Sequence, residues 1–367
     1  MTRDLVGCTR RKFLGGASML GIRTTDGGAM MTGLRTREFA RRDFLAGASS
    51  LGTASLLGLP CRAAAEAPPE TRRLRVSESL LTCIAPQVVA LELLHAEGFA
   101  DVQYVRYLRD TQHWPPEDLL AGEVDMTFSF PPTDIRFLDA GAPVVILAAA
   151  HTGCVELVAS DRIRSTRDLK GRPVGIDTDT KNFISMFVGY IGLDPQRDIE
   201  WVPIPWGEWV PLFTQGKIDA FMCSPPLSLE LRQKKIGHTL VNTTTDKPWS
   251  QYSCCMVAST KEFVRRNPVA TKRALRAILK GVDLCASDPS RVARFVADRG
   301  LGSYEITLQG LREVPYAQWR EIDPADSLRF WALRMHDVGA IKSSPQEIIA
   351  RGADWRFLNE LKRELKA

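Results

Sequence analysis

The sequence lacks the short motifs of the common catalytic centres. It contains no G-x-S-x-G, no H-E-x-x-H and no glycine-rich phosphate loop, which argues against a serine hydrolase, a zinc protease and a nucleotide-phosphate enzyme. After residue 65 no apolar run is long enough to cross a membrane as a helix. We therefore expect neither an enzyme nor a membrane-spanning chain, and we assign no catalytic residues.

Cysteine and histidine are few and show no metal-ligand spacing. None of the cysteines after residue 65 forms C-x-x-C, and the five histidines show no ligand spacing with them. Most of these cysteines lie in apolar segments, which favours buried small hydrophobic side chains. Their disulfide pairing stays open, and we expect no metal and no cofactor. The six are Cys83, Cys154, Cys223, Cys254, Cys255 and Cys285.

Positive charge is concentrated at the N-terminus. The chain of 367 residues has a net charge of +5, and residues 1–65 hold ten Lys/Arg against four Asp/Glu, whereas the remainder holds 38 against 39. That remainder has no basic run with interleaved aromatic residues. We therefore expect no nucleic-acid partner.

Residues 1–65 are predicted to be an export leader. Arg41-Arg42-Asp43-Phe44-Leu45 precedes a moderately apolar run, and Ala63-Ala64-Ala65 supplies an A-x-A cleavage pattern. Twin arginines before Phe-Leu resemble a twin-arginine signal, which the twin-arginine translocase reads. This predicts a periplasmic protein.

The leader leaves two further questions open. A similar segment upstream, residues 9–14, is explained most simply by a true start at Met30 or Met31, with a double leader as the alternative. Cys61 raises the question of lipidation, although Pro60 before it departs from a lipobox.

One pattern, Gly-x-(Val/Ile)-Asp-x-x-x-x-x-Pro-Pro, occurs twice, at residues 122–132 and 216–226. Its glycine tolerates the left-handed conformation that ends a helix. The mostly apolar run after the aspartate predicts a buried strand. The proline pair ends that strand and suits the first turn of a helix. Two copies predict two α/β lobes, each with a strand end beside a helix N-terminus.

Strand and helix patterns alternate around both copies, which predicts parallel sheets. Extended runs at 154–159 and 252–259 are the expected crossings between lobes, so that residues 160–251 form an inserted second lobe. Two crossing segments make a hinge. The predicted organisation is a leader over 1–65, lobe 1 over 66–153, hinge strands and lobe 2 over 154–259, and C-terminal helices returning to lobe 1 over 260–367.

Several stretches, in this order, resemble periplasmic solute-binding proteins of ABC importers, in the nitrate/sulfonate/taurine and thiamine-precursor group. They are residues 74–76 with 85–92, residues 122–132, Thr166 to Gly175, and Gly216 to Ala220. The likeness covers nearly all of residues 72–367. It implies an α/β chain with the type II periplasmic-binding-protein fold, in which two lobes are joined by a two-segment hinge. It also implies an ABC permease in the inner membrane as partner.

Ligands of open α/β sheets bind beyond the carboxyl ends of the strands, and the resemblance points to the same loops. Among them, Phe130 and Trp206 could clamp a ligand or pack between lobes, and His151 could donate to a ligand or cap its strand. Lys181 could face the ligand or be solvated. The candidate ligand-binding residues are Ser79, Leu81, Thr82, Phe130, Pro131, His151, Thr178, Thr180, Lys181, Trp206 and Ser224.

The charge of these loops bears on the ligand. Asp177, Asp179 and Glu208 add negative charge, which does not suit a small inorganic anion. A helix N-terminus contributes only about 0.3–2 kcal/mol to binding an anion, whereas micromolar binding needs about 8 kcal/mol. We therefore expect a small organic ligand, such as a planar heterocycle or an aromatic compound.

These features predict a monomeric periplasmic protein that captures a small organic solute and delivers it to an ABC permease. A periplasmic enzyme or sensor on the same fold is the alternative. One related branch resembles a thiamine-pyrimidine synthase with a cysteine-rich, iron-binding stretch. The nearest element here, Ser253-Cys254-Cys255-Met256, has only two adjacent cysteines, which argues against that enzyme.

Overall fold

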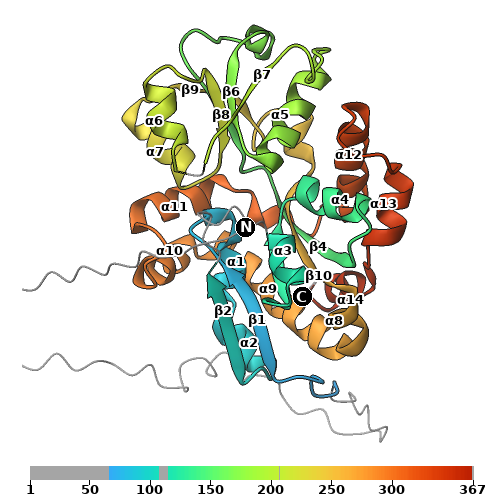
Figure 1. Cartoon of the computed structure of the whole chain (residues 1–367). Coiled ribbons are helices and arrows are strands. Elements are labelled where there is room, and N and C mark those ends of the chain that lie inside the picture. Colours follow the sequence, from blue (N-terminus) through green and yellow to red (C-terminus); the bar gives the residue numbers. More distant parts are fainter. Residues whose placement is uncertain (1–65, 107–114, 206, 366–367) are drawn as a thin grey trace, which may run out of the picture. The chain divides into compact units, whose positions relative to one another are not determined.

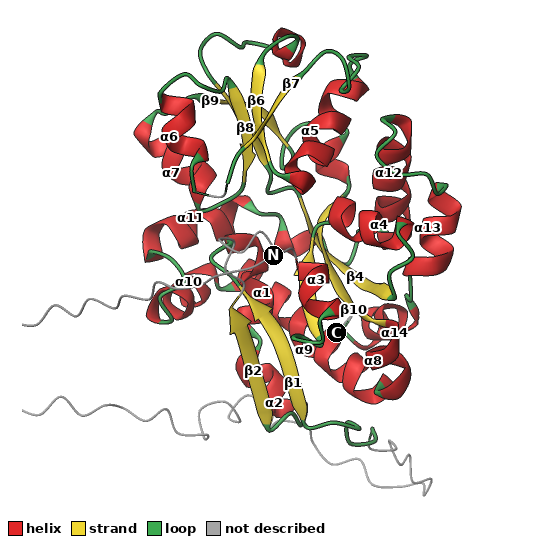
Figure 2. Ribbon diagram, in the orientation of Figure 1, coloured by secondary structure: helices red, strands yellow, loops and turns green. Residues whose placement is uncertain are grey.

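Two five-stranded mixed sheets form the framework of the chain in the computed structural model (Figures 1 and 2). The structure describes residues 66–106, 115–205 and 207–365. The predicted leader, with its twin arginines, candidate starts and Cys61, lies outside the described residues, and so does Trp206. We call the elements around sheet A lobe 1 and those around sheet B lobe 2. The exact domain boundaries drawn from the sequence stay predictions.

Sheet A has the strand order β2-β1-β3-β10-β4, in which β10 runs antiparallel to both of its neighbours. Strands β3 and β4 are buried along their whole length, as expected for strands covered on both faces. Its strands are β1 (Arg73–Glu78), β2 (Asp101–Arg106), β3 (Met126–Ser129), β4 (Val144–Thr152) and β10 (Ser253–Thr260).

Sheet B repeats this arrangement with the order β7-β6-β8-β5-β9, and here β5 is the antiparallel strand between β8 and β9. The two copies of the repeat supply β3 in one sheet and β8 in the other, as the sequence predicts. The strands are β5 (Glu156–Ala159), β6 (Pro173–Ile176), β7 (Glu200–Pro203), β8 (Ala220–Cys223) and β9 (His238–Asn242).

The chain passes between the sheets twice, from β4 to β5 and from β9 to β10. The first crossing leads into β5 and the second into β10, and each is the antiparallel strand of its sheet. The runs predicted as crossings therefore form strands of the two sheets. Figure 1 shows α5, α6 and α7 around sheet B, while the C-terminal helices lie beside sheet A.

Helices cover both sheets. Those before the second crossing are α1 (Ala85–Val89), α2 (Leu91–Ala96), α3 (Pro115–Leu120), α4 (Pro131–Asp139), α5 (Thr178–Tyr190), α6 (Trp209–Thr214) and α7 (Leu227–Lys234). Those after it are α8 (Lys261–Arg266), α9 (Pro268–Ser287), α10 (Pro289–Asp298), α11 (Tyr304–Glu313), α12 (Pro324–Asp337), α13 (Pro345–Gly352) and α14 (Arg356–Glu364). Short 3₁₀ turns are η1 (Thr82–Ile84), η3 (Thr166–Leu169), η4 (Trp249–Gln251) and η5 (Tyr316–Gln318).

The long helix α9 packs closely against α1 in the core of lobe 1. A Cβ atom added at Gly281 would lie 2.2 Å from the carbonyl oxygen of Pro86, so only glycine allows this approach. Within the part of the chain that the structure describes, no helix combines the length and the apolar character that a membrane span requires.

One local prediction is wrong and one strand was missed. The helical pattern of residues 85–97 predicts a single helix, but the structure divides it at Ala90 into α1 and α2. Strand β9 was not predicted, and it forms the edge of sheet B. Its sequence, HTLVN, is short and half-buried, so it gives little hydrophobic alternation from which a strand could be recognised.

Candidate ligand-binding site

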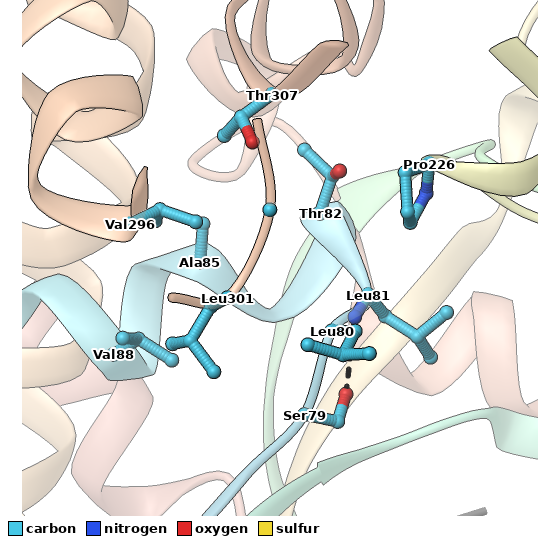
Figure 3. A pocket seen from close by; sticks show the side chains of 11 residues that line it. Ser79, Leu80, Leu81, Thr82, Ala85, Val88, Pro226, Val296, Leu301 and Thr307 are labelled. Carbon is cyan, nitrogen blue, oxygen red and sulfur yellow. Dashed lines mark hydrogen bonds between the residues drawn. The ribbon is translucent and has the colours of Figure 1, made fainter. Parts of the chain in front are cut away.

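A small pocket lies where the loop after β1 meets the C-terminal helices (Figure 3). Three hydroxyl side chains, those of Ser79, Thr82 and Thr307, are its polar lining, and no charged side chain contributes. Figure 3 also shows the backbone N–H of Leu81 donating to the Ser79 hydroxyl, at 3.2 Å. The full lining is Ser79, Leu80, Leu81, Thr82, Ala85, Val88, Pro226, Val296, Leu301, Gly302 and Thr307.

The pocket includes a residue of lobe 2 because the lobes meet beside it. The backbone N–H of Thr82 donates to the carbonyl oxygen of Pro225 at 3.1 Å, and Pro226 follows directly in the pocket wall. This contact joins the loop after β1 to the proline pair of the second repeat.

The first repeat contacts lobe 2 through a different element. Phe130 packs edge-on against Phe183 of α5, with ring centroids 5.9 Å apart. Nearby, Arg136 of α4 forms an ion pair with Asp179 of α5, at 3.2 Å between Nε and Oδ1. Each repeat therefore contributes to a contact between lobes. Phe130 of the first repeat contacts α5, and Pro225 of the second repeat contacts the loop at Thr82.

The helix N-termini beside these contacts have few free donors for an anion. At the start of α5 the Asp177 carboxylate already accepts from the backbone N–H groups of Asp179 and Thr180. Helix α4 begins with Pro131 and Pro132, which have no N–H. These termini are therefore poor sites for a small inorganic anion.

Two carboxyl groups near the contact between α4 and α5 have perturbed acidity. Burial raises the pKa of Asp134 to about 8, although its hydrogen bond with Ser129 opposes the shift. Burial also raises the pKa of Asp179 to about 6, and Arg136 opposes that shift. At neutral pH Asp134 is therefore mainly protonated, while Asp179 is mainly an ionised partner of Arg136.

The predicted site residues fall into separate groups. Ser79, Leu81 and Thr82 line the pocket. Phe130 and Pro131 are buried where α4 meets α5, so packing between lobes accounts for Phe130. Thr180, Thr178, Lys181 and Ser224 are the remaining described candidates outside the strands.

Those four occupy different environments. The Thr180 hydroxyl closes the capping box with Asp177, and Thr178 is exposed at the first position of α5. The Lys181 ammonium is exposed and lies 5.6 Å from the ring centroid of Trp201. Ser224 is buried at the end of β8. None of the four lines the pocket.

His151 is the second-last residue of β4 and is fully buried. Its ring packs edge-on against Tyr316, with centroids 5.1 Å apart. Burial lowers the pKa of His151, so the imidazole is neutral at physiological pH.

His151 lies in a group that spacing in the sequence does not reveal. Its ring and the thiols of Cys83, Cys154 and Cys255 bring four potential metal-ligand atoms within 4.8 Å of one another. Spacing along the sequence did not predict this grouping, because its members come from separate segments of the chain. The lining residues of α10, α11 and the turn between them were also missed, because only packing places them beside the loop at Thr82. Leu80 lies in that loop and was not among the predicted residues.

The comparisons with known proteins agree with this architecture. The model of the NMT1-like family matches residues 67–298. The chain belongs to the NMT1-like family. A stretch of 150 residues is 26% identical to the nitrate/nitrite binding protein NrtA of Synechococcus elongatus, covering 38% of this chain and 33% of that protein. The match therefore spans about a third of that relative's length.

Solved structures with a similar fold include two periplasmic binding proteins. The nitrate-binding protein NrtA from Synechocystis PCC 6803 has a TM-score of 0.69 at 15% identity, over 82% of this chain and 90% of that one. The alkanesulfonate-binding protein SsuA from Xanthomonas axonopodis pv. citri, bound to MOPS, has a TM-score of 0.64 at 15% identity. The match covers 78% of this chain and 99% of that one. This NMT1-like chain thus has the predicted periplasmic-binding-protein fold, and the named relatives support a solute-binding role.

Proposed function

We propose that the protein is a periplasmic solute-binding protein that captures a small organic molecule and delivers it to an ABC permease. Its lobes close around the ligand without chemical turnover. The observation that carries the choice of ligand is the pocket at the end of β1, whose lining has apolar side chains and three hydroxyls but no cation.

The pocket chemistry supports an uncharged or weakly polar ligand. A nitrate- or sulfonate-type anion gains most from charge-assisted hydrogen bonds, and the described lining has no cationic side chain to provide them. The pocket has a volume of only about 10 Å³ in this structure, so the lobes must move apart before a ring enters. Burying about 150–250 Å² of an aromatic ring when they close again then contributes roughly 4–6 kcal/mol. A few hydroxyl hydrogen bonds of about 1 kcal/mol each then bring the total close to the 8 kcal/mol of micromolar binding.

A thermal-shift screen followed by calorimetry tests the ligand class. The panel contains pyrimidines, aromatic acids, alkanesulfonates and nitrate. We expect at least one planar organic compound to raise the melting temperature and to be recovered unchanged by mass spectrometry. Tight binding of nitrate with no organic ligand would overturn the proposed class. Consumption of a bound compound would overturn the binding-only role.

Leu80 offers a variant that probes the pocket without disturbing the core. Its side chain lines the pocket yet is 56% exposed. Leu80→Glu should weaken binding of the organic ligand at least about tenfold, because it places a charge beside an apolar ligand. Leu333→Glu changes a similarly exposed leucine in α12 and is the matched control. Equal affinity in both variants would exclude the pocket as the site.

The remaining parts of the proposal rest on the sequence and the relatives. We propose a monomer exported by the twin-arginine pathway, with lobe boundaries at residues 66–153 and 154–259. Replacing Arg10, Arg11, Arg41 and Arg42 together by lysine should retain the precursor in the cytoplasm, which fractionation would measure. Normal export of that variant would contradict the assigned route.

A further inference from the structure

A buried group of three thiols and one imidazole lies at the junction of the two lobes. Cys83 belongs to η1, His151 to β4, and Cys255 to β10, while Cys154 lies in the crossing between β4 and β5. Their potential ligand atoms are within 4.8 Å of one another. All four side chains are almost completely inaccessible, with exposed fractions of 0–2%.

The hydrogen bonds of His151 fix which ring nitrogen is free. Nδ1 lies 3.2 Å from the carbonyl oxygen of Thr152 and 3.1 Å from that of Gly153. Carbonyl oxygens only accept, so Nδ1 carries the proton. Nε2 then has an unshared electron pair, and it is a buried polar atom without a hydrogen-bond partner. Metal-bound histidines commonly have this arrangement, because a backbone carbonyl holds the ring through its other nitrogen.

The dimensions of the group suit a tetrahedral ion. Zinc lies about 2.3 Å from a thiolate sulfur and about 2.0–2.1 Å from an imidazole nitrogen, which gives ligand–ligand separations of about 3.5–3.8 Å. An upper limit of 4.8 Å means that side-chain adjustments on the order of 1 Å bring all four atoms to those separations.

Surrounding residues hold the four side chains in place. The Tyr316 hydroxyl donates to the carbonyl oxygen of Thr82 at 3.0 Å, next to Cys83, and its ring packs on His151. Cys154 has a φ of 134°, an unfavourable backbone conformation for a residue with a side chain. Gly153 before it has a φ of 62°, and a Cβ there would lie 2.4 Å from Thr244.

We propose that Cys83, His151, Cys154 and Cys255 bind one zinc ion. The three thiols lose their protons to solvent on binding, and the neutral imidazole coordinates through Nε2. Three thiolates and one imidazole complete a tetrahedral shell. Since the site is buried and no ligand position is left for substrate, the ion is structural. It links η1, whose Thr82 lines the pocket, to both segments that pass between the lobes.

A disulfide bond between two of these cysteines is the alternative to zinc binding. The sulfur atoms of Cys154 and Cys254 are 3.1 Å apart, which is longer than the roughly 2.05 Å of a disulfide, and all six described cysteines are free thiols. A bond between Cys154 and Cys254 would remove one zinc ligand. In the zinc-bound form the Cys254 thiol instead donates a hydrogen bond to the Cys154 thiolate. The two states exclude each other.

Metal analysis of the full chain tests the site without any ligand or activity assay. Protein purified under reducing conditions, exposed to zinc and passed through gel filtration should retain about one zinc per chain. Cobalt substituted for zinc should show the intense visible absorption and sulfur-to-metal charge transfer of tetrahedral cobalt thiolate. The cobalt measurement uses the wild-type chain, so it does not depend on whether any variant folds.

Variants assign the ligands. His151→Ala and Cys255→Ser should each reduce retained zinc at least about tenfold, whereas Cys285→Ser, which removes a buried thiol of α9 outside the group, should retain it. Circular dichroism verifies that each variant is folded. Failure of the wild-type chain to retain zinc, octahedral cobalt spectra, or equal retention in all folded variants would overturn the proposal. A Cys154–Cys254 disulfide found by peptide mass spectrometry in protein that retains one zinc would also overturn it.

Discussion

Replacing Asp134 with asparagine should change how the stability of the protein depends on pH. The carboxyl is fully buried, and its pKa is raised to about 8 by burial, from about 3.9 in an unfolded chain. Between these values the folded state binds a proton that the unfolded state has released. Wild-type stability therefore decreases as pH rises. The limiting slope is about 1.4 kcal/mol per pH unit, and it flattens as pH approaches 8. Between pH 6 and pH 8 this group alone removes about 2 kcal/mol.

The asparagine variant has no proton to release at this position. Between pH 6 and pH 8 its free energy of unfolding should therefore decrease by about 2 kcal/mol less than that of the wild type. Urea unfolding of both proteins at pH 6, 7 and 8 measures the difference. Asp161→Asn, which removes an exposed carboxyl after β5, is the control for simple loss of negative charge. Parallel stability profiles for wild type and Asp134→Asn would refute the reasoning, because they would mean that the buried carboxyl titrates alike in both states.

Three further changes test contacts in the core and between lobes. Arg136→Gln leaves Asp179 buried without its ion-pair partner and should cost about 3 kcal/mol of stability at pH 8. The loss should be smaller at pH 5, which is below the Asp179 pKa of about 6. An equal loss at both pH values in urea titrations would contradict the ion pair. Phe183→Ala removes a ring that contacts Phe130 and Trp331, so calorimetry should show a loss of about 3–5 kcal/mol. Gly281→Ala forces α9 away from α1 and should destabilise by about 1–3 kcal/mol, and an unchanged melting temperature would contradict that close approach.

The sequence predicts the framework because the fold depends on local patterns. Each repeat combines a helix-ending glycine, an apolar run and a proline pair, and these produce β3 and β8 at the expected positions. The division at Ala90 and the strand β9 were missed for a physical reason. Both depend on packing against distant elements, and neither has a local break or alternation in the sequence.

The candidate site was only partly predictable. The rule that ligands bind beyond strand ends identifies Ser79, Leu81 and Thr82, which line the pocket. It cannot identify Val296 and Leu301, because the way the C-terminal helices return to lobe 1 is set by tertiary packing. The group of three thiols and one imidazole was even less predictable from the sequence. Its members come from four separate segments, so no spacing within the chain indicates that they meet.

The two proposed sites share one short segment, and this has a thermodynamic consequence. Thr82 lines the pocket and donates to Pro225 of lobe 2, while its neighbour Cys83 is a proposed zinc ligand. An ion that orders η1 reduces the conformational entropy that the segment loses when the organic ligand binds, so zinc should strengthen ligand binding. Linkage then requires the reciprocal effect, so that the organic ligand strengthens zinc binding by the factor by which zinc strengthens ligand binding. If zinc leaves the affinity for the organic ligand unchanged, the two sites are not coupled through this segment.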